Sequence, residues 1–306
     1  MLDEVRAGLH RLPRELPSKY FYDERGSRLF EEITRLPEYY LTRAEREVLI
    51  ARASEIAAVT RARSLVELGA GSASKTRIVL AALGEQTARL TYVPVDVSED
   101  FLRETGAALR QEFPALVVAP VVADISVALD VPRTLDRPIL FAFLGSTIGN
   151  FESKDAVLLL KRIRDSMRSD DHFLLGVDLR KDPAVIHAAY NDDAGVTAEF
   201  NRNILRVINA ELDADFVPEC FAHRAFYDEV EDRIEMRLDS LRDQIVHIPG
   251  IEPIVFARGD SIRTELSHKY DRAAVDQLCD EAGLAVTHWF TDHRDQFALS
   301  LLALRS

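Results

Sequence analysis

Hydrophobic and polar positions alternate along the middle of the chain in a pattern that predicts a sheet protein. From Ser64 onward, short apolar runs are separated by stretches whose apolar residues recur at helical spacing. The predicted strands are Ser64–Leu68, Thr91–Val97, Leu116–Val122, Pro138–Leu144 and Phe173–Val177. The helices predicted between them include Lys75–Leu83, Glu99–Glu112 and Ala156–Met167. This order predicts a parallel sheet with helices on both faces.

The rest of the chain follows other patterns. Residues 1–60 predict helices at Ser27–Arg35 and Thr42–Val59, and Thr42 with Glu45 has the spacing of a capping box. Between about 182 and 265 the predicted elements are the helix Val196–Leu212 and the strands Arg224–Val230, Arg233–Asp239 and Gln244–Ile248. The last predicted elements are the helix Ala273–Ala282 and the strands Ala285–Phe290 and Gln296–Leu304. The final two strands suit an antiparallel pair that closes the sheet.

These patterns predict an α/β protein with a discontinuous sheet domain. The expected parts are a helical N-terminal segment at 1–60, a sheet domain at 61–181 and 268–306, and an inserted α+β lobe at 182–267. No internal repeat or low-complexity segment interrupts this organisation.

Composition and charge narrow the class of partner. The 306 residues carry 51 acidic and 38 basic side chains, giving a net charge of −13, and they contain no dense run of Lys and Arg. Such a surface repels nucleic acid, so a small molecule or a protein is the expected partner. No apolar stretch reaches the roughly 20 residues of a membrane helix, and no signal-peptide pattern opens the chain.

The cysteines predict a protein of a reducing compartment, and the histidines predict no metal site. Cys220 and Cys279 lie far apart in the sequence, so two reduced thiols in a cytoplasmic protein are expected. The eight histidines are scattered without the spacing of metal ligands. No coiled-coil or symmetric pattern indicates an oligomer, and a monomer is the expectation.

One short segment combines a strand end with a glycine turn. The apolar run that ends at Leu68 is followed by Gly69, Ala70 and Gly71, and then by a polar stretch that opens a helix. Glycines let the backbone turn tightly and approach a ligand closely. Ser74 stands where a third glycine would complete a dinucleotide fingerprint, which argues against NAD. The Glu-x-Gly-x-Gly form resembles the first motif of class I methyltransferases, which bind S-adenosylmethionine (SAM).

Three further strand ends carry residues that suit such a cofactor or its reaction. Ligands bind at the carboxyl ends of parallel strands, so Asp96, at the end of the second predicted strand, suits the ribose hydroxyls. Asp124, at the end of the third, suits the adenine amino group, with Ile125 beside it. Both aspartates also suit helix N-caps or loops. The fourth strand leads into Phe143–Asn150, whose small residues suit a methyl-transfer site and equally a plain strand–helix turn.

Several longer blocks of sequence share the pattern of one enzyme family. The blocks are Ser18–Asp23, Gly26–Phe30, Leu36–Tyr40, Phe143–Asn150, Ala194–Asn203 and Thr264–Tyr270. They resemble the histidine Nα-methyltransferases of ergothioneine biosynthesis and run in the family's order from about residue 18 to the C-terminus. The resemblance implies a class I methyltransferase (Rossmann-like) fold and the SAM-dependent trimethylation of the α-amine of L-histidine, giving hercynine.

The resemblance also implies roles for the residues at matching positions. Segment 1–60 is implied to contribute to the substrate site, and the lobe at 182–267 to recognise the substrate. The residues implied to orient the amine and flank the transferring methyl are Tyr22, Tyr39 and Asn150. Those implied to bind the substrate are Phe30, Tyr39, Gly145, Asn150, Tyr190, Met236, Glu265 and Ser267. The expected cofactor residues, from the strand ends and the resemblance together, are Gly69, Gly71, Lys75, Asp96, Asp124 and Ile125.

Methyl transfer to the amine of histidine requires side chains of these types. An amide and a phenol, as in Asn150 and Tyr190, hold a carboxylate without a full charge. Phenol rings tolerate an amine that becomes a cation as methyl groups accumulate. The carboxylate of Glu265 suits an imidazole N–H, and such a site rejects side chains that lack the donor. Without the resemblance, Glu265 would be read as a solvated charge at a strand end.

Two residues depart from the family pattern, and two alternatives stay open. His268 and Tyr270 stand where Cys and Phe are expected in close relatives, which leaves room for a shifted substrate. One alternative is an N-methyltransferase of another amino acid, such as a tryptophan derivative, which Glu265 and Met236 disfavour. The other is a SAM-binding protein without catalysis, which the full set of catalytic residue types disfavours.

Overall fold

A computed structural model describes residues 1–71, 73–125, 127, 129, 131–132 and 134–305 of the chain. Its contacts divide the chain into two compact units. The first, called here the lobe unit, comprises Met1–Tyr40 and Lys181–His268. The second, called the sheet unit, comprises Leu41–Arg180 and Lys269–Ser306. The first sixty or so residues are thus shared, since Met1–Tyr40 and the helix that follows it fall in different units.

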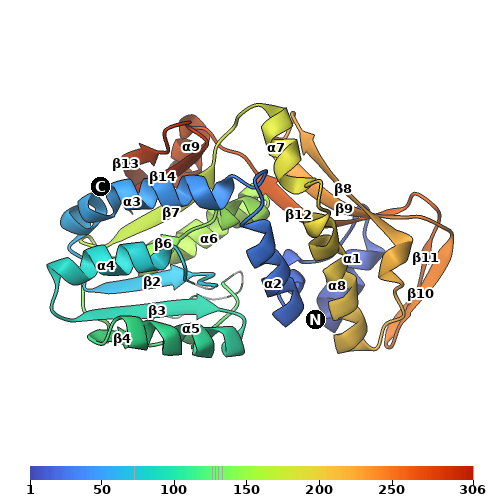
Figure 1. The fold of residues 1–306 in the computed structure, drawn as a ribbon, viewed down its shortest axis with the longest axis horizontal. Coiled ribbons are helices and arrows are strands. Elements are labelled where there is room, and N and C mark those ends of the chain that lie inside the picture. The colour runs from blue at the N-terminus through green and yellow to red at the C-terminus, as the bar shows by residue number, and fades with distance from the viewer. Residues whose placement is uncertain (72, 126, 128, 130, 133, 306) are drawn as a thin grey trace. The chain divides into compact units, whose positions relative to one another are not determined.

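The sheet unit is built on one mixed sheet. Its strands are β2 (Ser64–Leu68), β3 (Leu90–Asp96), β4 (Leu116–Val118), β5 (Val121–Val122), β6 (Ile139–Phe143), β7 (His172–Asp178), β13 (Leu284–Thr291) and β14 (Phe297–Leu304). Their order is β13-β14-β7-β6-β2-β3-β4 (Figure 1). β5 also pairs with β3. The neighbouring strands β4, β3, β2, β6 and β7 run parallel to one another. β14 and β13 close the sheet as an antiparallel pair.

Helices cover both faces of this sheet. They are α3 (Leu41–Thr60), α4 (Thr76–Gln86), α5 (Glu99–Glu112), α6 (Ser153–Ser166), α9 (Arg272–Ala282) and the 3-10 helix η2 (Thr147–Asn150). Alternate residues of a strand point to opposite faces. Leu65 of β2 accordingly packs in an apolar layer with α3 and α4, and Val66 in another with α6 and α9. The core is therefore two apolar layers separated by the sheet.

The lobe unit combines helices with a mixed sheet that is mainly antiparallel. Its elements are α1 (Leu2–His10), β1 (Arg14–Glu15), η1 (Ser18–Phe21), α2 (Glu24–Ile33), α7 (Pro183–Tyr190), α8 (Val196–Leu212), η3 (Pro218–Cys220), β8 (Phe221–Asp228), β9 (Arg233–Ser240), β10 (Gln244–Ile248), β11 (Ile251–Phe256) and β12 (Ser261–His268). The main sheet has the order β1-β12-β9-β8, and β10 pairs with β11 as a hairpin. Within the described part of the chain, no helix is long and apolar enough to span a membrane.

Most predicted elements are present, several of them with the predicted bounds. β2, α5, α8 and β10 begin and end where the pattern placed them. The predicted third strand is wrong as a continuous element, because it is split into β4 and β5. Pro120 lies between the two pieces and has no backbone N–H for the ladder. The pattern did not predict α1, α7, β11 or β12.

The capping box predicted for the second helix is wrong. α3 begins at Leu41, so Thr42 lies inside the helix. The carboxylate of Glu45 is buried and accepts a hydrogen bond from the backbone N–H of Gly145 at 2.7 Å. The side chain of Glu45 therefore bonds Gly145, far away in the sequence, and does not cap the start of α3.

Candidate active site

The glycine turn and the aspartate that ends β3 lie together in the sheet unit. Gly69 and Gly71 have φ angles of 63° and 49°, in the left-handed region that favours glycine. Oδ2 of Asp96 accepts a hydrogen bond from the backbone N–H of Gly71 at 3.2 Å. Among the described residues, nothing lies within 4 Å of a Cβ atom built on Gly71. The turn therefore has room for a ligand against its backbone.

These residues lie where the strand order reverses, between β2 and β6. β2 pairs with β3 on one side and with β6 on the other, and all three are parallel. In open α/β sheets, ligands bind outside the carboxyl ends of the strands at such a switch point. Gly69 follows β2, Asp96 ends β3 and Gly145 lies just after β6. The structure thus brings three separately predicted residues to one edge of the sheet.

A buried carboxylate connects two more of the predicted residues. Besides accepting from Gly145, Glu45 forms an ion pair with Nζ of Lys75. A Cβ atom built on Gly145 would lie 3.4 Å from the same Nζ atom, so Lys75 reaches the loop after β6. Sequence reasoning missed Glu45, because the capping-box spacing offered a local explanation for it.

The loop after β6 is held against the neighbouring strand. Ser146 has a left-handed φ of 59°, and its Oγ accepts a hydrogen bond from the backbone N–H of Asp178 at 2.8 Å. The N–H of Gly149 donates to the carbonyl oxygen of Ser146 at 2.9 Å. Asn150 ends η2 and is half-buried. These bonds fix the backbone that carries Asn150.

The acidic residue of the glycine motif is a second buried carboxylate. Both oxygens of Glu67 lie within hydrogen-bond distance of the Thr76 hydroxyl, at 2.6 and 2.8 Å, and the Tyr92 hydroxyl donates to Oε2. Burial raises the pKa of Glu67 to about 7, although the hydrogen bonds from Thr76 and Tyr92 act in the opposite direction. Glu67 therefore ties β2 to α4 and β3 beneath the glycine turn.

Asp124 follows the end of β5 by two residues. β5 ends at Val122, and Asp124 and Ile125 lie in the loop that follows. The carbonyl oxygen of Ile125 is 3.5 Å from a guanidinium nitrogen of Arg162. The strand ends at Val122, as predicted, and Asp124 follows it by two residues. The roles of Asp124 and Ile125 in binding SAM stay predictions.

In the lobe unit, the three predicted aromatic residues form one cluster. The ring centroid of Phe30 lies 5.8 Å from that of Tyr22 and 6.2 Å from that of Tyr39, each at an edge-on angle. Phe200 of α8 supports them, with centroids 5.6 Å from Tyr22 and 6.0 Å from Phe30. Edge-on contacts are a favoured geometry for aromatic pairs. Sequence reasoning missed Phe200, although it lies inside the block Ala194–Asn203.

A buried asparagine holds the turn that carries Tyr22. Nδ2 of Asn203 donates to Oδ1 of Asp23 at 2.7 Å and to the carbonyl oxygen of Phe21 at 3.3 Å. Asp23 is the N-cap of α2 and accepts from the N–H of Gly26 at 2.7 Å. A Cβ atom built on Gly26 would lie 1.7 Å from the Phe21 carbonyl oxygen, so this approach requires glycine. Two blocks of the family resemblance thus contact one another.

Tyr190 and the residues predicted to bind the imidazole form a second cluster in the lobe unit. The hydroxyl of Tyr190, at the end of α7, donates to Oγ of Ser267 on β12 at 2.8 Å. Glu265 stands directly opposite Met236 in the antiparallel pair of β12 and β9. Directly opposite residues share one face of a sheet. Met236 is buried and Glu265 is partly exposed, so an apolar and an acidic side chain lie next to each other on that face.

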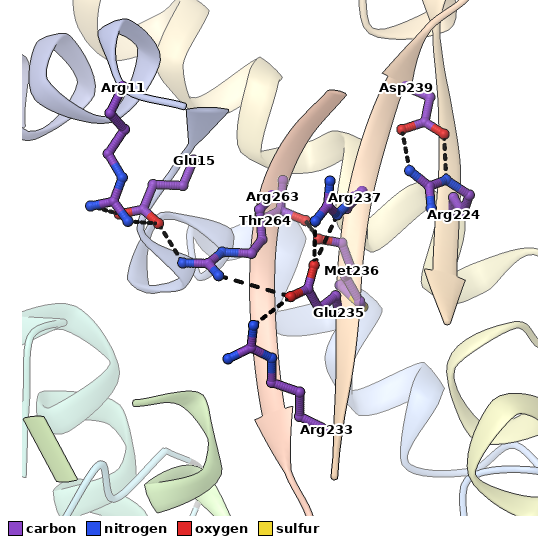
Figure 2. Close-up of polar contacts among 10 residues, drawn as sticks. All are labelled: Arg11, Glu15, Arg224, Arg233, Glu235, Met236, Arg237, Asp239, Arg263 and Thr264. Atoms are coloured by element: carbon purple, nitrogen blue, oxygen red, sulfur yellow. Dashed lines mark hydrogen bonds and ion pairs between the residues drawn. The ribbon is translucent and has the colours of Figure 1, made fainter. Parts of the chain in front are cut away.

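The other face of these strands carries an arginine network. Glu235 accepts hydrogen bonds from Arg233 at 2.8 Å and from Arg237 at 2.5 Å, and Arg263 lies 3.9 Å away (Figure 2). Burial acts to raise the pKa of Glu235, but the bonds from Arg237 and Arg233 outweigh it and hold the pKa below its ordinary value. This network stabilises the lobe sheet.

One group of side chains in the sheet unit has the chemistry of a metal site. Among the described residues, Glu47, Asp292 and His293 place ligand atoms within 4.8 Å of one another. Hydrogen bonds account for all three. Nδ1 of His293 lies 2.8 Å from the Glu47 carboxylate, and Asp292 accepts from the N–H groups of Gln296 and Phe297. The group is a hydrogen-bonded histidine and glutamate beside a turn held by Asp292.

Comparisons with known proteins show the family of this chain. A family model described as histidine-specific methyltransferase, SAM-dependent, matches residues 1–304. The chain belongs to this family. Histidine N-alpha-methyltransferase of Mycobacterium tuberculosis is 44% identical over 302 residues, which cover 98% of this chain and 94% of that protein. Ergothioneine biosynthesis protein 1 of Neurospora crassa is 32% identical over 95% of this chain, which spans 33% of the Neurospora protein.

A solved structure supports the fold of this family member. The CcbJ methyltransferase from Streptomyces caelestis superposes with a TM-score of 0.54 and 15% identity, covering 93% of this chain and all of that chain. The predicted class I methyltransferase fold is confirmed, as is the dependence on SAM that the family description states. The open glycine turn and the carboxylate of Asp96 fit such a cofactor.

Proposed function

We propose that this methyltransferase trimethylates the α-amine of L-histidine to hercynine in ergothioneine biosynthesis. The observation that carries the proposal is the placement of Glu265 opposite Met236, on the strand whose Ser267 bonds Tyr190. An imidazole has an N–H donor for a carboxylate and flat apolar faces for a thioether. The names of the Mycobacterium and Neurospora relatives support the same activity.

The substrate is proposed to be held at its two ends. Asn150 and Tyr190 bind the α-carboxylate, and Glu265 and Ser267 bind the imidazole, against which Met236 packs. These contacts involve groups that do not change as the amine gains methyl groups. The same contacts therefore suit the primary, secondary and tertiary amines in turn.

The amine is proposed to lie among the remaining residues. Tyr39 and Asn150 orient it, Tyr22 lies near the transferring methyl, and Phe30 and Gly145 line the pocket. The nitrogen attacks as a neutral lone pair, and alignment of the reacting atoms contributes about 7–11 kcal/mol in well-oriented reactions. The aromatic cluster also suits the trimethylated product, because ring faces attract a cation.

SAM supplies an electrophilic methyl group on a sulfonium. The backbone at Gly69 and Gly71 is proposed to accommodate it closely, and Asp96 to accept its ribose hydroxyls. Lys75, paired with Glu45, is proposed to support the cofactor loop. The adenine end is assigned to Asp124 and Ile125.

The test is mass spectrometry of the purified protein with SAM and a panel of amino acids that includes L-histidine, L-phenylalanine and L-tryptophan. Trimethylated histidine as the main product is the expected result. Methylation of tryptophan in its place would move the substrate pocket but keep the cofactor site. Binding of SAM without methylation of any amino acid would overturn the catalytic role and leave a binding protein.

The proposal extends to the state of the molecule in the cell. We propose a cytoplasmic protein, supported by Cys220 and Cys279 as free thiols. We propose a monomer because the sequence has no coiled-coil or symmetric pattern. Light scattering at several protein concentrations measures the oligomeric state, and a mass twice that of the chain would contradict the monomer.

A further inference from the structure

Strand β12 carries an extra residue in the middle of its ladder with β9. Arg263 is paired with Arg237, whereas Glu265 is paired with Met236, the next residue along β9. Two steps on β12 therefore match one step on β9, and Thr264 is the additional residue of a β-bulge. Bulges re-aim side chains and are common next to active sites.

The bulge decides which face Glu265 occupies. In a regular strand, residues two apart point to the same face, so Arg263 and Glu265 would lie together. With the bulge, Arg263 stays with Arg237 on the face of the arginine network (Figure 2). Glu265 is paired with Met236 and joins it on the other face. Ser267, paired with Ile234, follows Glu265 to the same face.

A buried asparagine and the threonine hydroxyl lock this bulge. Oγ1 of Thr264 donates to Oδ1 of Asn201 at 2.6 Å and lies 3.1 Å from the carbonyl oxygen of Met236. Nδ2 of Asn201 donates to the carbonyl oxygen of Arg237 at 3.0 Å. Asn201 and Thr264 are almost completely buried, at 0% and 1% exposure, so water does not compete for these bonds. α8 is thereby fastened to both strands at the bulge.

The same network continues to Tyr190. The second N–H of Asn201 points to Nδ1 of His223 at 2.9 Å, and Nε2 of His223 lies 2.9 Å from the carbonyl oxygen of Tyr190. An amide N–H can only donate and a carbonyl can only accept. His223 is therefore the neutral tautomer with its proton on Nε2, in agreement with burial, which lowers its pKa. Every polar atom of the Asn201 side chain has a partner.

We propose that Asn201 and Thr264 are positioning residues for imidazole recognition. They hold the bulge that places Glu265 and Ser267 beside Met236, and through His223 they hold the backbone of Tyr190. This role rests on the proposed function and adds residues that do not themselves touch the substrate.

The first variant removes one hydroxyl at constant shape. Thr264→Val is expected to raise the KM for histidine roughly fivefold to tenfold, because a lost buried hydrogen bond costs about 1 kcal/mol. The kcat at saturating histidine and the Kd for SAM are expected to stay close to wild type. Thr264→Ser keeps the hydroxyl, and its KM for histidine is expected to stay close to that of the wild type. An unchanged KM in a folded Thr264→Val protein would overturn the inference.

The chain offers a control at a second β-bulge, where the threonine is exposed. Thr287 is the additional residue of a bulge in β13, and its Oγ1 donates to the carbonyl oxygen of Leu301 at 2.9 Å. Thr287→Val is therefore the same chemical change at a bulge of the sheet unit. It is expected to leave the KM for histidine unchanged, and an equal rise in both variants would show a general loss of stability.

A double-mutant cycle tests whether Thr264 acts through Glu265. The KM effects of Thr264→Val and Glu265→Ala are expected to be non-additive, with the double variant close to Glu265→Ala alone. Additive effects would show that Thr264 does not position Glu265. If Thr264→Val does not fold, Asn201→Asp is the alternative variant, because it keeps the shape of the side chain and replaces the NH₂ donor group by an acceptor oxygen. The KM of Asn201→Asp for histidine is expected to rise in the same way. An unchanged KM would again overturn the inference.

The assay of the wild-type protein distinguishes failure of the proposed function from failure of the positioning role of Asn201 and Thr264. Failure of the wild-type protein to methylate histidine would overturn the proposed function and this role with it. Histidine methylation by the wild type, together with an unchanged KM in Thr264→Val, would overturn this inference alone.

Discussion

The carboxylate of Glu45 accepts the backbone N–H of Gly145 at 2.7 Å, although the two residues are 100 positions apart. The bond joins α3 to the loop that follows β6, at the edge of the sheet where the glycine turn lies. The same carboxylate pairs with Lys75, which immediately precedes α4. One buried acid thus connects three segments around the predicted cofactor residues.

The first prediction is that Glu45→Gln weakens SAM binding. The amide keeps an acceptor for Gly145, but its NH₂ group cannot pair with the ammonium group of Lys75. The Kd for SAM, measured by calorimetry, is expected to rise roughly tenfold, the equivalent of one hydrogen bond to a charged group at about 1.4 kcal/mol. Glu47→Gln, on the same helix but in an exposed pair with His293, is the control and is expected to leave the Kd unchanged.

The second prediction concerns substrate choice. Glu265→Ala is expected to weaken histidine binding by about 1.5–3 kcal/mol, the scale of a hydrogen bond to a charged group. Phenylalanine, which has no N–H in its side chain, is expected to lose nothing, so the preference for histidine shrinks. Glu231→Ala removes an exposed acid of the β8–β9 turn and serves as the control. Unchanged histidine affinity in Glu265→Ala would exclude Glu265 from imidazole recognition.

The third prediction separates binding from rate. Asn150→Ala is expected to raise the KM and lower the kcat together, because the same amide is proposed to contact the carboxylate and the amine. A loss of at least tenfold in kcat/KM is expected, the equivalent of about 1.4 kcal/mol. The control is Asn209→Ala, since Asn209 bonds the backbone of Phe216 and has no proposed contact with the substrate. Normal kinetics in Asn150→Ala would remove that residue from the site.

Local patterns predicted the sheet unit well because its strands are continuous apolar runs. β2 and α5 have the predicted bounds, and the glycine turn was recognised from its own spacing. β12 was missed for a physical reason: the bulge at Thr264 breaks the alternation on which a strand is recognised. α7 had a usable signal, since Asp182 caps the helix and Pro183 occupies its first turn.

The residues that support the site were harder to predict than those proposed to touch the substrate. Glu45, Asn201 and Phe200 act through partners that are far away in the sequence, and their types alone fit a helix surface or core. Family blocks pointed to their neighbourhood without assigning them a role. Only the folded chain shows that Asn201 spans β9, β12 and His223.

The last prediction is a pH-dependent stability of the sheet unit that originates at Glu67. Burial raises the pKa of Glu67 to about 7, above the ordinary value of 4.5. The folded state therefore binds a proton that the unfolded state releases between these two pH values. The stability contributed by protonated Glu67 is fully present below about pH 4.5 and is lost as the pH rises through 7.

Glu67→Gln tests this assignment, because the amide cannot ionise. The free energy of unfolding, measured with urea at several pH values between 5 and 8.5 without cofactor, is expected to fall with pH less steeply in the variant. The difference between variant and wild type is expected to grow toward alkaline pH by up to about 3 kcal/mol, from 1.36 kcal/mol per unit of pKa shift. Glu55→Gln, an exposed acid on α3, is expected to show no such trend. A difference that stays constant with pH would mean that Glu67 is already ionised in the folded protein below pH 5, and that the hydrogen bonds from Thr76 and Tyr92 overcome its burial.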